Sequence, residues 1–131
     1  MSRIICVDFD GTLAEHKFPD IGLEVPGAFA VLKELQAAGH RLILWTMRSN
    51  FNGDKFLDQA VQWCGEREVE FWGVNDNPQQ GTWTNGPKVY AQIYIDDAAL
   101  GCPLCASTEV DRPMVDWDGV RQHLVDIGVL A

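Results

Sequence analysis

The sequence predicts an α/β protein with the form of a Rossmann-like three-layer sandwich around a central, mainly parallel sheet. Short apolar segments recur along the chain, and segments with helical periodicity separate them. Strands that alternate with helices in this way form parallel sheets. The chain has 131 residues, of which 47% are hydrophobic, enough for one core. We therefore expect residues 1–131 to form a single domain.

The first predicted strand is Ile4–Val7, a continuous apolar run typical of a strand buried on both faces. It runs directly into Asp8 and Asp10, which precede a Gly-Thr turn. Parallel sheets bind ligands at the carboxyl ends of their strands. Two carboxylates at such a place repel each other unless a cation or a proton lies between them. We therefore interpret this segment as a candidate site and not as a simple Asp-Gly turn.

The next segments predict a loop, a helix and a second strand. Residues 14–25 show no regular period and form a loop on the same edge as the two acids. A helix is predicted to begin at Pro26, which suits a first helical position, and to end at Gly39. The second strand covers residues 41–45 and stops at Thr46.

A second helix, a third strand and a long loop follow. Asp54 is a suitable N-cap for this helix, whose apolar residues recur at helical spacing. Residues 69–74 predict the third strand, and residues 75–87 predict a long polar loop.

The last third of the chain predicts a strand, a hairpin and a helix. Residues 92–95 form the strand, which runs into the acid pair Asp96 and Asp97. Residues 102–114 are expected to form a small hairpin, and Asp116 caps the final helix.

Polar residues thus follow three predicted strands, and Lys88 precedes the fourth. The carboxyl ends of parallel strands lie at one edge of a sheet, so these side chains can converge in one crevice. Several carboxylates at one point favour a hard cation such as Mg²⁺. Thr46 and Lys88 opposite them would bind an anion that bridges to the metal, and phosphate fits that description.

These residues resemble the motifs of the haloacid dehalogenase superfamily of phosphohydrolases. The segment Asp8-Phe9-Asp10-Gly11-Thr12-Leu13 resembles the first motif. Thr46, Lys88 and the pair Asp96-Asp97 match the second, third and fourth motifs in order, so the resemblance covers nearly the whole chain. The gaps between motifs hold no room for a cap domain, which makes the chain similar to small, capless members.

The resemblance implies a Mg²⁺-dependent phosphatase that works through an aspartyl-phosphate. Asp8 would be the nucleophile, and Asp10 would act as general acid and then as general base. Asp8, the main-chain carbonyl of Asp10 and Asp96 would hold the metal, with Asp97 behind them. Thr46 and Lys88 would bind phosphoryl oxygens. The expected partner is a phosphorylated substrate.

Other residues near the predicted site have weaker assignments. His16 lies in the loop over the site and Arg48 follows Thr46 by two residues, so both are candidate substrate contacts. Cys102 and Cys105 have the spacing of a zinc knuckle, but no second pair completes it. We expect reduced thiols there.

Two alternative functions come from other classes. One is a retired enzyme that serves as a binding or regulatory module. The other is a receiver-type phosphoacceptor, which also gathers acids, a threonine and a lysine around Mg²⁺. A receiver would carry its phosphorylated aspartate after the third strand, whereas here that strand ends at Val74 and Asn75.

The charge balance limits the partners. There are 19 acidic residues against 10 lysines and arginines, and the net charge is −9. This charge disfavours nonspecific binding to nucleic acids and to acidic membranes. The sequence has no long apolar run and no basic-apolar leader, so we expect a cytoplasmic protein without a membrane segment.

Overall fold

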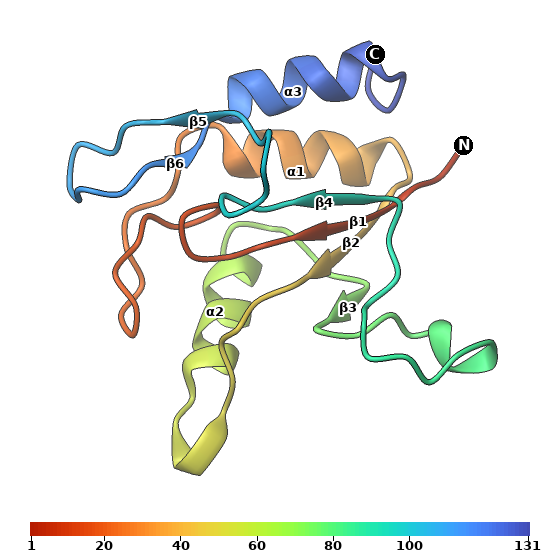
Figure 1. The fold of residues 1–131 in the computed structure, drawn as a ribbon, viewed down its shortest axis with the longest axis horizontal. Coiled ribbons are helices and arrows are strands. Elements are labelled where there is room, and N and C mark those ends of the chain that lie inside the picture. Colours follow the sequence, from red (N-terminus) through yellow and green to blue (C-terminus); the bar gives the residue numbers. More distant parts are fainter.

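The structure, a computed structural model, describes residues 1–131 and forms three layers (Figure 1). A four-stranded sheet lies in the middle. The helices α1 (Ala28–Ala37) and α3 (Trp117–Asp126) cover one face, and α2 (Phe56–Gly65) covers the other. This arrangement confirms the predicted α/β sandwich with a central parallel sheet.

All four strands of the sheet are parallel, in the order β3-β2-β1-β4. Their bounds are β1 Ile4–Val7, β2 Arg41–Leu44, β3 Gly73–Val74 and β4 Ile93–Ile95. In the register, Val7 is level with Leu44 on one side and with Ile95 on the other. The residues that directly follow β1, β2 and β4 therefore lie side by side at one edge of the sheet.

The core explains why β1 lies at the centre. Ile5, Cys6 and Val7 are each at most 1% exposed, as a continuous apolar run in a doubly covered strand requires. Phe29, Leu32 and Leu35 of α1 are buried in the same core. Fully burying a side chain of this size contributes about 1.5–3 kcal/mol.

The starts of the first two helices differ from the sequence prediction. The first helix begins at Ala28 and not at Pro26, because Gly27 at its N-cap adopts a φ of 81°. That conformation is open to glycine at no steric cost and separates the proline from the helix. The second helix begins at Phe56, and its N-cap position is Lys55, with no side-chain capping hydrogen bond, so Asp54 does not cap it.

The third strand is shorter than predicted. It covers Gly73–Val74 and not residues 69–74. Glu68 has a φ of 65°, and the N–H of Glu70 donates to the Gln36 side chain at 2.9 Å, so this part of the chain pairs with a helix and not with β2.

The C-terminal segment forms the predicted hairpin and helix. β5 (Leu104–Cys105) pairs antiparallel with β6 (Met114–Val115). Asp116 caps α3 by accepting a hydrogen bond from the Asp118 N–H at 3.2 Å. Two 3₁₀ turns, Phe51–Gly53 and Gln80–Thr82, complete the helical elements. No helix combines the length and the apolar character that crossing a bilayer would require.

Candidate functional site

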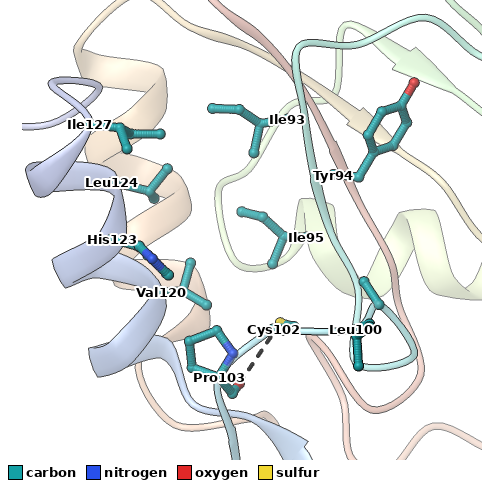
Figure 2. Close-up of a pocket in the computed structure, with 12 residues that line it drawn as sticks. Ile93, Tyr94, Ile95, Leu100, Cys102, Pro103, Val120, His123, Leu124 and Ile127 are labelled. Atoms are coloured by element: carbon teal, nitrogen blue, oxygen red, sulfur yellow. Dashed lines mark hydrogen bonds between the residues drawn. The ribbon is translucent and has the colours of Figure 1, made fainter.

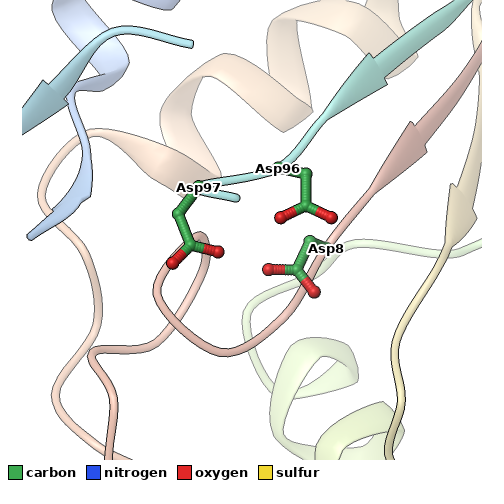
Figure 3. A group of neighbouring side chains, drawn as sticks. All are labelled: Asp8, Asp96 and Asp97. Atoms are coloured by element: carbon green, nitrogen blue, oxygen red, sulfur yellow. The ribbon is translucent and has the colours of Figure 1, made fainter. Parts of the chain in front are cut away.

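Asp8, Asp96 and Asp97 meet at the carboxyl ends of β1 and β4 (Figure 3). An oxygen atom from each carboxylate lies within 4.8 Å of the others. The two strands are paired in parallel, and the Asp8 N–H donates to the Ile95 carbonyl at 2.9 Å. The strand register thus brings together acids that are far apart in the sequence.

The cluster is electrostatically costly without a cation. Burial, followed by the charge of Asp96 and hydrogen bonding with Asp97, raises the pKa of the Asp8 carboxyl to about 8. Burial likewise raises the pKa of Asp96, although the Ala98 N–H opposes the change. A divalent cation would offset this repulsion, and an all-oxygen donor set suits a hard ion such as Mg²⁺.

Thr12 connects the two strand ends, a role that the sequence analysis missed. Its side chain is fully buried. Its hydroxyl donates to Asp8 Oδ2 at 2.9 Å and accepts from the Asp97 N–H at 3.2 Å. The signal in the sequence was its position two residues after Asp10, inside the motif itself.

His16 binds one of the three acids. Its Nε2 lies 2.7 Å from Asp97 Oδ2, across the loop that follows β1. Gly11 allows this contact, because it has a φ of 82° and a methyl group there would overlap both the imidazole and the Asp97 carboxylate. The predicted candidate for a substrate contact is therefore at the site, but Asp97 holds it.

Asp10 points to Arg48 and is separate from the three-acid cluster. The guanidinium donates to both carboxylate oxygens, from Nη2 at 2.8 Å and from Nε at 2.9 Å. It also donates to the carbonyl oxygens of Pro19 at 3.1 Å and Asp20 at 2.7 Å. The Arg48 side chain is 0% exposed. The expectation that Arg48 contacts substrate is therefore wrong: it is buried and holds Asp10 to the 14–25 loop.

An open pocket of about 610 Å³ lies over these side chains. Its lining residues are Asp8, Asp10, His16, Phe18, Trp45, Thr46, Met47, Asp96, Asp97, Ala98 and Arg112. Thr46 is at the predicted place. Its N–H donates to Asn75 Oδ1 at 2.8 Å and its hydroxyl oxygen accepts from the Arg48 N–H at 3.1 Å. The hydroxyl hydrogen remains available for a ligand.

Lys88 does not line this pocket, although we expected it to bind a phosphoryl oxygen there. It lies along a different pocket, and its Nζ is 5.4 Å from the centre of the Tyr94 ring. The Gln80 side chain fixes this segment by donating to the Lys88 carbonyl at 2.7 Å and accepting from the Tyr90 N–H at 2.7 Å. These contacts keep residues 86–90 against the 3₁₀ turn, away from Asp8.

A second cavity, of about 260 Å³, lies between β4 and α3 (Figure 2). Nine of its twelve lining residues are hydrophobic, and it holds none of the clustered acids. Cys102 is at its edge, with Sγ 3.8 Å from the Pro103 carbonyl, and Cys105 Sγ is 3.9 Å from the Val115 carbonyl. All four cysteines of the chain are free thiols. The lining of this cavity is therefore mainly apolar and holds no group of acids that could bind a metal ion.

The raised pKa of Asp8 leads to a prediction for the metal-free protein. Its unfolded-state value is 3.8 and its folded-state value is about 8. Between these values the folded state keeps a proton that the unfolded state has released, so stability falls as pH rises. We expect Asp8→Asn to remove this decline. Urea unfolding in EDTA, from about pH 5 to about pH 8, measures it. If the free energy of unfolding falls equally with pH in wild type and in Asp8→Asn, Asp8 is not the cause of the decline.

One solved structure is similar over nearly the whole chain. It is a conserved protein from Bacteroides thetaiotaomicron, with 35% sequence identity and a TM-score of 0.76. The match covers 97% of this chain and 92% of that chain. No protein-family model matches the sequence, and no curated protein matches it.

Proposed function

The chain belongs to the same family as the conserved Bacteroides thetaiotaomicron protein, and we propose that it is a Mg²⁺-dependent phosphohydrolase of the haloacid dehalogenase type. One observation carries the proposal. Asp8 ends the central strand, clusters with Asp96 and Asp97, and shares an open pocket with Thr46. The order of these residues along the chain also resembles the motifs of that superfamily.

The residues present fit a magnesium ion. Asp8 and Asp96 supply carboxylate oxygens, and Asp97 lies within the same cluster. The main-chain carbonyl of Asp10 accepts no backbone hydrogen bond, so it is free to be a further ligand. Because Asp97 accepts from His16 on one oxygen, we assign it the supporting position. When bound, Mg²⁺ would neutralise the charge of the carboxylates and of the phosphoryl group.

The chain's own residues supply the covalent steps. Asp8 attacks phosphorus, the bond from phosphorus to the leaving oxygen breaks, and Asp10 gives that oxygen a proton. Water then attacks the aspartyl-phosphate, Asp10 takes the proton, and phosphate and free Asp8 are formed. Thr46 donates a hydrogen bond to a phosphoryl oxygen. Both oxygens of Asp10 accept from Arg48, an arrangement that suits the base of the second step. In the first step Asp10 must carry the proton that it gives to the leaving oxygen. A protonated carboxyl cannot accept on both oxygens in this way, so one of the hydrogen bonds from Arg48 is lost.

The same pair favours a second candidate function. If both hydrogen bonds from Arg48 persist, Asp10 gives no proton to the leaving oxygen, the cycle stalls after Asp8 accepts a phosphoryl group, and the protein is a binding or phosphoacceptor module. The position of Lys88 outside the pocket points the same way. Stable labelling of Asp8 by a phosphoryl donor, without release of phosphate, would favour this alternative.

Hydrolysis of p-nitrophenyl phosphate tests the proposal. We expect p-nitrophenol release with Mg²⁺, none in excess EDTA, and recovery when Mg²⁺ is restored. Mg²⁺ should also raise the stability of the folded protein, by about 2.7 kcal/mol at a hundredfold excess over its dissociation constant. Asp96→Asn should remove most of that gain. Undiminished activity after exhaustive removal of metal would contradict the proposal.

A further inference from the structure

An anionic substrate that enters the pocket meets four carboxylates, those of Asp8, Asp10, Asp96 and Asp97. A metal ion offsets part of this charge, but the remainder of a charged substrate needs a positive side chain on the pocket wall. Of the ten lysines and arginines in the chain, Arg112 alone lines this pocket.

The other cationic candidates are not available to a substrate. The Arg48 guanidinium is buried beneath the pocket and donates four hydrogen bonds to protein oxygens. Lys88 lies along a different pocket. His16 is already bound to Asp97. Arg112 is therefore the cation that a ligand can reach.

The segment that carries Arg112 is hydrogen-bonded to the loop that follows β1. Arg112 lies in the connection between β5 and β6. Figure 1 shows this connection at the end of the sheet where β1 and β4 end. Three residues after Arg112, the Val115 N–H donates to the Gly11 carbonyl at 2.9 Å, and Trp117 Nε1 donates to the Thr12 carbonyl at 2.7 Å. At the other end of the connection, the Ser107 hydroxyl donates to the buried Glu15. The hairpin thus holds its tip over the pocket.

Arg112 itself has no partner in the protein. It takes part in none of the five salt bridges and in none of the side-chain hydrogen bonds, and it is exposed. Its guanidinium is a planar fork of donors that suits a carboxylate or phosphate group in a bidentate manner. An unpaired arginine at the rim of an acidic pocket is placed to bind such a group.

Four of the residues that line the pocket are apolar. Phe18, Trp45, Met47 and Ala98 line it, and Met47 is 74% exposed. A substrate body that contacts these residues would be apolar or aromatic, and Arg112 would add one anionic contact.

We propose that Arg112 determines the substrate specificity of this pocket. It binds a second anionic group of the substrate. It thereby selects phosphate monoesters whose leaving group has an apolar or aromatic body and one anionic substituent. The selection rests on the proposed phosphohydrolase function, whereas the binding contact does not.

Two aryl phosphates that differ by one carboxylate test this selection. Phenyl phosphate lacks the second charge and 4-carboxyphenyl phosphate carries it. Arg112→Ala should lower kcat/KM for the carboxylated substrate about tenfold, the scale of one charge-assisted hydrogen-bonded contact, and leave phenyl phosphate unchanged. Arg112→Lys should fall between wild type and Arg112→Ala. Lys33→Ala changes an exposed lysine of α1 that lies outside the pocket, and it should change neither substrate.

Each other outcome counts against the assignment. Equal losses on both substrates would mean that Arg112 binds the transferred phosphoryl group, and no loss on either would mean that it binds neither group. An equal tenfold effect of Lys33→Ala would overturn the view that Arg112 is the pocket cation.

A binding measurement separates this proposal from the proposed function. Benzylphosphonate and 4-carboxybenzylphosphonate cannot be hydrolysed, and calorimetry with Mg²⁺ present gives their affinities. We expect wild type to prefer the carboxylated compound about tenfold and Arg112→Ala to lose the preference. If wild type hydrolyses neither aryl phosphate but keeps this preference, the function fails and the Arg112 contact stands. Equal affinities in wild type would overturn the contact.

Discussion

Replacing Asp8 by Asn is expected to abolish phosphate-ester hydrolysis, with a loss in turnover of about 10⁴-fold or more, the scale of losing a covalent nucleophile. An amide oxygen cannot attack phosphorus to form a stable acyl-phosphate, and the variant also loses a metal-binding charge. The amide oxygen can still accept from Thr12, which donates to Asp8 at 2.9 Å, so the loop geometry should persist. Steady-state hydrolysis of p-nitrophenyl phosphate with saturating Mg²⁺ measures the loss.

Two comparison variants make this result specific. Asp54→Asn changes an exposed acid in the loop before α2 and should keep full activity. Asp10→Asn should slow the second step more than the first, so that phosphoenzyme accumulates in a quench experiment. Asp8→Asn should form no phosphoenzyme at all. Turnover of Asp8→Asn within tenfold of wild type would show that the nucleophile is another group.

Asp8→Asn is expected to lower activity but to raise the free energy of unfolding of the metal-free protein. Burial and neighbouring acids raise the pKa of Asp8 to about 8, so its charged form is unfavourable in the metal-free fold. An uncharged side chain of the same shape removes that cost. An inactive variant that is more stable in EDTA than wild type would be the expected pattern for a residue retained for chemistry and not for folding.

Hydrophobic patterning made much of the fold predictable. The unbroken apolar run of β1 requires cover on both faces, and α1, α2 and α3 supply it. Errors occurred where backbone conformation, and not hydrophobicity, decides the boundary. Because of the backbone conformation of Gly27, α1 begins later than predicted. Glu68, with its φ of 65°, has the same effect on β3. Hydrophobic periodicity does not specify the positive φ of either residue.

The candidate site was predictable where strand register alone determines position. Asp8, Thr46 and Asp96 follow adjacent parallel strands, so their convergence follows from the sheet. Lys88 lies in no regular element, and its place depends on side-chain contacts such as that of Gln80 with its carbonyl. The loop between β5 and β6 posed the same difficulty, because only the folded hairpin brings Arg112 to the pocket.

The role of Arg48 could not be predicted from its position in the sequence. Its position two residues after Thr46 indicates proximity to the site, but proximity does not distinguish a substrate contact from a structural one. The structure distinguishes them by burial and by partners. The guanidinium lies 5.0 Å from the centre of the Phe9 ring and 5.1 Å from that of Phe18, between two aromatic faces. These contacts keep its fork directed at Asp10.

Replacing Arg48 by Ala is therefore expected to destabilise the protein by about 3–5 kcal/mol, the cost of removing one partner of a buried ion pair. The variant leaves both Asp10 oxygens and the carbonyls of Pro19 and Asp20 without their donor. Arg121→Ala is the matched control. Arg121 makes the same two-pronged contact with Glu34, at 2.8 and 2.9 Å, but both side chains are over 40% exposed. Because water screens that pair, its removal should change the free energy of unfolding little.

Urea unfolding of wild type and the two arginine variants measures the difference. Asp10→Asn combined with Arg48→Ala should cost less than the sum of the single changes, because the second change removes the charge that the first leaves unpaired. Phosphatase activity of Arg48→Ala, measured where the variant is still folded, should also fall, since Asp10 loses its fixed orientation. Equal stability losses in Arg48→Ala and Arg121→Ala would mean that the buried pair contributes no more than the exposed one. Additive losses in the double variant would mean that Arg48 stabilises the fold through Phe9, Phe18 and the loop carbonyls, independently of Asp10.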